Sequence, residues 1–329
     1  MKGFIYVLMV LGMVSCGAKN KPSATTPANK VTPVMKEKTT FNVDSAYLYI
    51  KTQEDFGPRV PNTKAHDACG KYLVSQLQRY GAKVFEQDMM LTAYNGEKLK
   101  SKNVIGSYLP EAKDRILLFA HWDSRPYADH DPDPANYHTP IMGTDDGASG
   151  VGVLLEVARQ LQVRTPNVGI DIIFFDTEDY GAPSFDKGTY TDDWCLGTQF
   201  WTKNPHVKNY TAKFGILLDM VGAKNATFYK EYISQRYAAR YVDLIWDQAR
   251  DLGYGKFFIN ADGGGITDDH EYVIKGLGIP CVDIINYDPN SKTGFGWYWH
   301  TLKDTMDNID KETLQAVGET LMEVIYKQK

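Results

Sequence analysis

The segments DRILLFAHWDS (114–124) and VGIDIIFFDTEDYG (168–181) decide the fold of this chain. Each begins with a short apolar run and ends in polar residues that can bind a metal or carry a proton. Apolar runs of this length, rich in Ile, Leu and Phe, are typical of parallel strands that are covered on both faces. Two further runs have the same character, 214–218 (FGILL) and 279–285 (IPCVDII). We therefore expect four buried strands.

Helical patterns fall between and after these runs. They cover about 63–80, 147–162, 233–252 and 311–327. Strands that alternate with helices predict an α/β fold, in which helices cover both faces of a sheet. Sheets of this kind place their functional sites at the carboxyl ends of the strands.

The composition is that of a globular protein. Of 329 residues, 43% are hydrophobic and 23% are charged. The chain has 36 Lys and Arg against 41 Asp and Glu, a net charge of −5, so it lacks the basic excess of a nucleic-acid binder and we expect no nucleic-acid partner. Four cysteines are too few for a disulfide scaffold at this length.

The first residues, MKGFIYVLMVLGMVSC (1–16), have the pattern of a signal peptide. The apolar run that follows Lys2 is shorter than the roughly 20 residues that span a bilayer. It ends at Val14-Ser15-Cys16, which resembles a bacterial lipoprotein signal and implies lipidation of Cys16. Ordinary signal cleavage is the alternative, and both imply export.

These patterns divide the chain into three parts. We expect a signal peptide at 1–15, a lipid-anchored flexible tether at 16–40, rich in Pro, Thr and Lys, and one catalytic domain at 41–329. The anchor would be the only contact with a membrane. If Cys16 is lipidated, Cys69, Cys195 and Cys281 remain, so at most one disulfide can form, and the sequence assigns no pair.

Residues that can bind metals follow three of the predicted strands. His121 follows the first strand, Glu178 and Asp179 follow the second, and Asp219 follows the third. The segment GTDDGASG (143–150) adds an acidic pair just before a helix, and WYWHTLKDTMDN (297–308) contains a histidine before the last helix. Aspartate, glutamate and histidine around one open position form catalytic zinc sites. Their convergence on one sheet edge predicts such a site.

Each of these residues by itself has a simpler explanation. An aspartate after a strand is often a helix N-cap, and a lone histidine is more often an ordinary core or surface residue than a ligand. The acidic residues at 129, 131 and 133 do not form a calcium loop, because Pro134 occupies the position of the required glycine. Ser149 does not lie in a G-x-S-x-G motif, which disfavours a serine hydrolase. Only the occurrence of several aspartate, glutamate and histidine residues at successive strand ends favours the zinc site.

Five of these motifs resemble a known superfamily. HWDS (121–124), GTDDGASG, the pair Glu178-Asp179, ILLDMVGA (216–223) and WHTLKDTMDN (299–308) occur in the same order in M28-type zinc aminopeptidases and in the related animal-type glutaminyl cyclases. The resemblance runs from about residue 45 to the C-terminus and is greatest to lipoprotein-like glutaminyl cyclases of Bacteroidetes. It implies a zinc aminopeptidase-like (phosphorylase/hydrolase-like) fold with a mixed, mostly parallel twisted sheet.

The resemblance also implies roles around the metal. Asp145, Asp179 and His300 match the ligands of one zinc ion, and Glu178 matches the general acid/base. His121 and Asp219 match the groups that hold a second metal in the aminopeptidases, and they are vestigial ligands in the cyclases.

Further roles follow from the same resemblance for residues around the substrate. Asp268 matches the acidic residue of a catalytic hydrogen-bond network, in which Asp219 also takes part. Trp194 and Trp299 match the aromatic walls of the substrate pocket. Asp283 stands where the animal enzymes have a histidine. We therefore expect Asp283 to bind substrate, and the hydrogen-bond network around Asp268 to differ from that of the animal enzymes.

The activity that the resemblance implies is zinc-dependent glutaminyl-peptide cyclotransfer, an acyltransferase reaction. It converts the N-terminal glutamine of exported peptides or proteins to pyroglutamate with release of ammonia, in the periplasm of a bacterial cell envelope. An M28-type aminopeptidase is the alternative, because His121 and Asp219 are both present. A catalytically inactive binding domain is a remote alternative, because the ligand positions are filled. Trp299 directly before His300, WCLGTQFW (194–201) and DDH (268–270) favour cyclisation.

Overall fold

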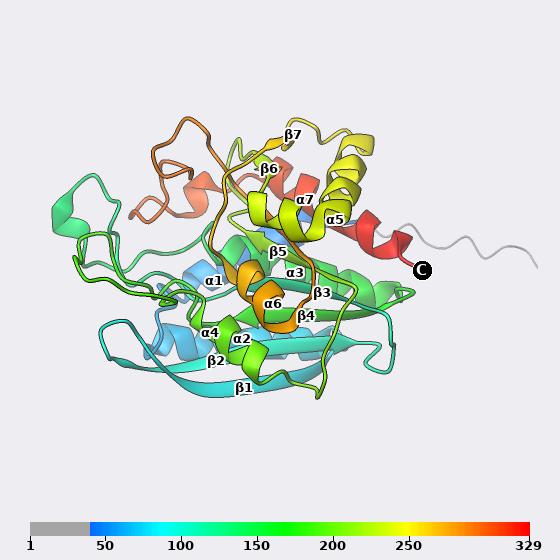
Figure 1. Cartoon of the computed structure of the whole chain (residues 1–329), viewed down its shortest axis with the longest axis horizontal. Helices are drawn as coiled ribbons and strands as arrows, with labels where there is room; N and C mark the ends of the chain where they lie inside the picture. Colours follow the sequence, from blue (N-terminus) through cyan, green and yellow to red (C-terminus); the bar gives the residue numbers. More distant parts are fainter. Residues whose placement is uncertain (1–39) are drawn as a thin grey trace, which may run out of the picture. The chain divides into compact units, whose positions relative to one another are not determined.

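The computed structural model describes residues 40–329 (Figure 1). The predicted signal peptide, most of the tether and the predicted lipidation site Cys16 lie outside the described residues. The described residues belong to one compact unit. No helix in this part of the chain is long and apolar enough to cross a membrane.

The centre of the fold is a six-stranded sheet with the order β1-β2-β4-β3-β5-β8. Its strands are β1 (Lys83–Thr92), β2 (Lys98–Tyr108), β3 (Arg115–His121), β4 (Gly169–Phe175), β5 (Phe214–Asp219) and β8 (Cys281–Ile285). The neighbours β4, β3, β5 and β8 pair in parallel, whereas β1–β2 and β2–β4 are antiparallel. The four predicted strands and the mixed, mostly parallel sheet are confirmed. Two short strands, β6 (Phe228–Lys230) and β7 (Phe258–Asp262), pair separately.

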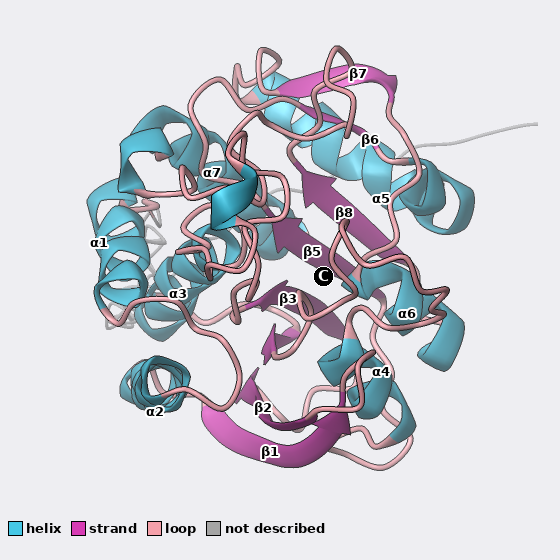
Figure 2. Ribbon diagram, turned by 90° about the vertical axis from the view of Figure 1, so that its left-hand side faces the viewer, coloured by secondary structure: helices cyan, strands magenta, loops and turns pink. Residues whose placement is uncertain are grey.

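Helices cover both faces of the sheet, as predicted (Figure 2). They are α1 (Val43–Asp55), α2 (Lys64–Arg79), α3 (Ala148–Val163), α4 (Leu196–Lys203), α5 (Tyr232–Asp251), α6 (Asp269–Leu277) and α7 (Lys311–Lys327), with short 3₁₀ turns at Pro134–Asn136 and Met306–Asn308. The predicted helices α2, α3, α5 and α7 begin and end within two residues of their predicted bounds. Side-chain N-caps fix several starts: Thr63 accepts from the N–H of His66, and Asp310 from that of Thr313.

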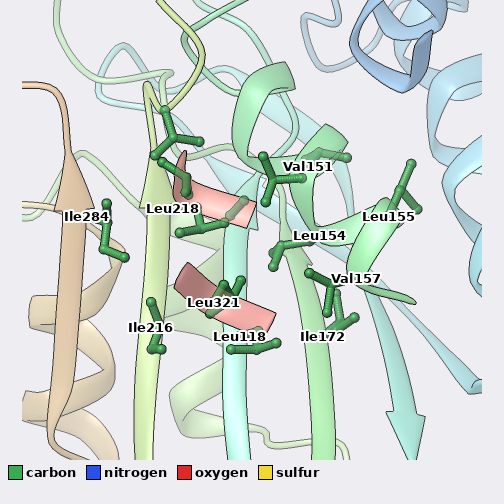
Figure 3. Packing of buried hydrophobic residues seen from close by; sticks show 14 of the residues in the cluster. Leu118, Val151, Leu154, Leu155, Val157, Ile172, Ile216, Leu218, Ile284 and Leu321 are labelled. Carbon is green, nitrogen blue, oxygen red and sulfur yellow. The ribbon is translucent and has the colours of Figure 1, made fainter. Parts of the chain in front are cut away.

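Alternate residues of each central strand enter two different cores. In β3, Leu118 faces the larger core, where Val151 and Leu154 of α3 and Leu321 of α7 pack against the sheet (Figure 3). Its neighbour Leu117 faces the smaller core, which includes side chains of α4 and α6. Because both faces of the sheet are covered, successive residues of these strands are all apolar, which produces the continuous apolar runs in the sequence.

Strands β1 and β2 and helices α1, α4 and α6 were not predicted. Strand β1 (KVFEQDMMLT) lies at the sheet edge, and most of its residues are exposed or only half-buried, so it has no continuous apolar run. Helix α1 has a detectable signal, because Asn42 caps it and Ala46, Tyr49 and Ile50 form a buried stripe at helical spacing.

Candidate active site

The carboxyl ends of the parallel strands bring the predicted polar residues together. His121 ends β3, Asp219 ends β5, and Asp179 follows β4 by four residues. The Nε2 atom of His121 lies 3.1 Å from Asp146 Oδ1 and 3.3 Å from Asp219 Oδ1. The Nε2 atom of His300 lies 3.4 Å from Asp179 Oδ1 and 3.6 Å from Asp146 Oδ2. All five side chains are buried.

These side chains form two triads that share Asp146. One consists of Asp146, Asp179 and His300, and the other of His121, Asp146 and Asp219. In each triad the potential ligand atoms lie within 4.8 Å of one another. Carboxylate oxygens and imidazole nitrogens are the donors that zinc takes in catalytic sites. Asp179 Oδ2 is buried without a hydrogen-bond partner, so the first triad offers an unused oxygen and fits a zinc ion.

A carboxylate lies behind each of the two imidazoles. Asp123 Oδ1 lies 3.5 Å from His121 Nδ1, and Asp129 Oδ1 lies 3.3 Å from His300 Nδ1. Carboxylates in this position orient a metal-binding histidine and keep its other nitrogen toward the metal. The Asp123 oxygens also accept the backbone N–H groups of Glu178 (3.0 Å) and Asp179 (3.2 Å), which fixes the loop after β4.

A cavity of about 540 Å³ opens on the two triads. Trp194 and Trp299, the two predicted wall residues, both line it. The indole of Trp299 stacks on the His300 imidazole with 3.7 Å between ring centroids. The indole of Trp194 is also nearly parallel to this imidazole, with an angle of 10° between the ring planes and 6.2 Å between the ring centroids. Glu178, Asp219 and Asp268 also line the cavity, together with segments 264–267 and 291–295.

Glu178 is half-buried at the floor of this cavity. Its Oε1 accepts the thiol S–H of Cys195 at 3.1 Å, and Asp268 contributes a carboxylate to the same group of potential ligand atoms. Burial raises the pKa of Glu178 well above its usual value. The nearby His121 lowers this pKa, whereas the negative charge of Asp268 raises it further. Burial and the nearby Asp219 raise the pKa of Asp268 in the same way. A carboxyl group whose pKa is raised in this way can hold a proton and return it.

A model of peptidase family M28 matches residues 103–325. The chain belongs to peptidase family M28. Among solved structures, Tannerella forsythia glutaminyl cyclase is 65% identical, with a TM-score of 0.87 over 88% of this chain and 100% of that chain. A Zn-dependent exopeptidase from Parabacteroides distasonis has the same identity and TM-score over 88% and 99%. The bovine glutaminyl-peptide cyclotransferase is 25% identical over 82% of this chain and 79% of its own length.

One predicted ligand of this M28 site is wrong by a single residue. Asp145 Oδ2 accepts the hydroxyl of Tyr298 at 2.6 Å, and Oδ1 accepts the N–H of Gly222 at 2.7 Å, so both oxygens are engaged away from the triads. Asp146 supplies the shared carboxylate in its place. Asp304 fixes this arrangement, because its carboxylate accepts the N–H groups of both aspartates.

The predicted substrate contact of Asp283 is also wrong. The side chain is fully buried and does not line the cavity. It lies behind Asp268 and 3.7 Å from His270 Nδ1, and the Nε2 atom of His270 lies 3.2 Å from Glu231 Oε2. The cavity therefore meets Asp268, whereas Asp283 belongs to a buried polar group that supports it.

Arg125, Asp129 and Cys195 are among the residues near the site that were not predicted to contribute to it. Asp129 lies in an acidic run that does not match a calcium loop, Cys195 lies within WCLGTQFW (194–201) without a role assigned to it, and no motif includes Arg125. Cys69, Cys195 and Cys281 are all buried free thiols, and no disulfide forms among residues 40–329.

Proposed function

We propose that this chain is a zinc-dependent glutaminyl-peptide cyclotransferase, an acyltransferase that converts an N-terminal glutamine to pyroglutamate and releases ammonia. The observation that carries the proposal is the aromatic-walled cavity, in which the triad of Asp146, Asp179 and His300 lies beside the carboxyl groups of Glu178 and Asp268. The glutaminyl cyclase that is 65% identical over its whole length supports it.

The metal of this site is Zn²⁺, held in our proposal as one ion per chain by Asp146, Asp179 and His300. When bound, zinc supplies Lewis-acid polarisation of the γ-carboxamide oxygen. Asp129 contacts His300 Nδ1 and would leave Nε2 available to the ion.

Glu178 carries the proton. The α-amine attacks the γ-amide carbon, a C–N bond forms, and the bond to the leaving nitrogen breaks. Glu178 accepts the proton that the attacking amine loses and returns it to the departing ammonia, so one carboxylate serves first as base and then as acid. Asp268 lies in the same group of atoms and, because its pKa is raised, can present a carboxyl group to the leaving nitrogen.

Trp194 and Trp299 hold the substrate in the bent conformer that cyclisation requires. Fixing such a conformer can supply about 7–11 kcal/mol of the barrier. The two indoles flank His300 and restrict water, which would otherwise hydrolyse the amide. Asp219 also lines the cavity, and its Oδ1 lies 3.3 Å from His121 Nε2.

An M28-type aminopeptidase is the second candidate, and the triad of His121, Asp146 and Asp219 favours it. His121, Asp146 and Asp219 would then hold a second metal ion, which would supply activation of a water molecule, and Glu178 would be the base that takes its proton.

One experiment separates the candidates. Ammonia release from Gln-dipeptides and hydrolysis of Leu-anilides are measured in the same sample, with bound zinc counted per chain. We expect ammonia release, no anilide hydrolysis and one zinc. Two metals with anilide hydrolysis would make the protein an aminopeptidase, and metal without either activity would indicate an inactive binding domain.

We also propose that residues 1–15 are a signal peptide, that Cys16 carries a lipid, and that the domain at 41–329 acts in the periplasm on exported peptides or proteins. The signal-like pattern at 1–16 supports this. Labelled palmitate should enter the full chain but not its Cys16→Ser variant when each is expressed in a bacterium. Equal labelling of the two would refute the anchor.

A further inference from the structure

A buried arginine lies directly behind the candidate active site. Arg125 follows β3 by four residues and is 1% exposed. Its Nε donates to Asp129 Oδ1 at 2.7 Å and its Nη2 to Asp129 Oδ2 at 2.9 Å. This is a bidentate ion pair, the geometry in which both side chains are fixed most firmly.

The pair also contacts three parts of the site. Arg125 Nη1 donates to the backbone oxygen of Asp179 at 3.1 Å and to its Oδ1 at 3.3 Å. The guanidinium lies 4.6 Å from the ring centre of Trp194, within the range of a cation–π interaction. On its other side, Asp129 faces His300 Nδ1 at 3.3 Å. Neither Arg125 nor Asp129 lines the cavity.

We propose that the Arg125–Asp129 pair is a positioning device that holds His300, Asp179 and the Trp194 wall as one unit, so that affinity for zinc and affinity for substrate depend on the same guanidinium. This inference rests on the proposed function for its substrate, but not for its metal.

The contacts explain how one pair can serve both affinities. The Asp129 carboxylate, 3.3 Å from His300 Nδ1, favours a proton on that nitrogen and so leaves Nε2 for a metal. Arg125 occupies Asp179 Oδ1, while Oδ2 has no hydrogen-bond partner. The same guanidinium supports the indole of Trp194 from behind. A lysine would keep the charge but lose the planar, bidentate contact.

The chain contains a matched control at the other end of β3. Arg115 donates from Nε to Asp171 Oδ2 at 2.6 Å and from Nη2 to Asp171 Oδ1 at 2.7 Å. This pair is also buried and bidentate, but neither residue lines the cavity or contacts a proposed ligand. A loss of buried ion pairing in general would affect both pairs equally.

The test compares R125K and D129N with R115K and D171N in the full chain. Zinc dissociation constants are measured by competition with a chelator, unfolding midpoints on the metal-free proteins, and KM with a Gln-dipeptide. We expect R125K and D129N to raise the zinc dissociation constant by about 10–100-fold and to raise KM as well. R115K and D171N should lower the unfolding midpoint and leave zinc affinity unchanged.

Two results would overturn the proposal: zinc affinity within twofold of the parent in R125K and D129N, or an equal loss of zinc affinity in R115K and D171N. If R125K does not fold, D129N decides alone, because asparagine preserves the shape of the carboxylate. Failure of the proposed function is a separate result, in which the parent protein binds zinc but releases no ammonia.

Discussion

The two ends of β3 differ in how their buried charges are satisfied. At the amino end, both oxygens of Asp171 bind Arg115, and Oδ2 also accepts the hydroxyl of Tyr210 at 2.8 Å. At the carboxyl end, several buried side-chain atoms of the described residues have no hydrogen-bond partner. They are His121 Nδ1, Asp179 Oδ2, Asp268 Oδ2, Asp269 Oδ2, His270 Nδ1, both oxygens of Asp283 and His300 Nδ1.

The difference indicates that the two ends of the sheet serve different purposes, stability at one end and binding at the other. An unpaired buried polar atom costs about 1–3 kcal/mol, so a cluster of them persists only where another process uses it. The amino end contributes stability, because its charges are neutralised within the protein. The carboxyl end can bind a metal and a substrate, which would supply partners for Asp179 Oδ2 and Asp268 Oδ2, since both residues line the cavity.

The largest difference should appear between Glu178→Gln and Asp171→Asn. The first change removes the proposed proton carrier, and turnover should fall by about 10²–10⁴-fold with zinc retained. The second breaks a buried ion pair, which typically lowers stability by about 3–5 kcal/mol, and turnover of the folded protein should persist. Steady-state ammonia release and urea unfolding measure the two effects. Undiminished turnover in Glu178→Gln would remove this residue from the mechanism.

Adjacent aspartates give the next comparison. Asp146→Asn should weaken zinc binding by more than about 100-fold, because it removes a carboxylate that would bind the metal directly. Loss of a residue that only supports a ligand typically weakens binding by less than this. Asp145→Asn should retain zinc, because this side chain bonds Tyr298 and Gly222. Zinc counted per chain after dialysis decides between them. If Asp145→Asn loses zinc and Asp146→Asn retains it, Asp145 is the ligand, as predicted from the sequence.

Two buried thiols give a smaller difference. Cys195→Ala removes a donor to Glu178 and should lower kcat by about tenfold with KM unchanged, as expected for a hydrogen bond worth about 1.5 kcal/mol. Cys195→Ser should recover most of the rate, because a hydroxyl can donate in the same place. Cys281→Ala, in the smaller core, should affect only stability. Equal rates for all three variants would leave Cys195 without a role in the reaction.

The stability of the metal-free protein should also depend on pH. Burial raises the pKa of Asp269 to about 7, and burial together with Asp268 raises that of Asp283 well above its usual value. The folded state therefore binds these protons more tightly than the unfolded chain, where the pKa is about 3.9, so stability should rise as pH falls from above 7 toward 4.

Asp283→Asn provides the control for this pH dependence. It should stabilise the metal-free protein at pH 8 and flatten the slope, each unit of pKa difference contributing about 1.4 kcal/mol. Unfolding midpoints from pH 5 to 8 after chelation measure this. A slope that is unchanged by Asp283→Asn would assign the protons to other groups.

The sequence by itself determined the central layers of the fold. Strands β3, β4, β5 and β8 are covered on both faces, and helices such as α2 and α7 carry their own caps and apolar spacing, so each signal is local. It also determined which residues end the strands, and therefore that His121, Asp179 and Asp219 meet at one edge. Strand β1 was not predicted because exposed residues at the sheet edge interrupt its apolar run. Strand β2 was not predicted because buried polar residues, Ser101, Asn103 and Ser107, interrupt its run.

Only the tertiary structure decided which atoms of the site face the metal. Asp145 and Asp146 are adjacent and identical, and the choice between them is made by Tyr298 and Asp304, more than 150 positions away in the chain. The support of His300 by Asp129 and of Trp194 by Arg125 likewise joins segments distant in the sequence. Side-chain direction in a loop depends on such partners rather than on local spacing, and no periodicity in the sequence records it.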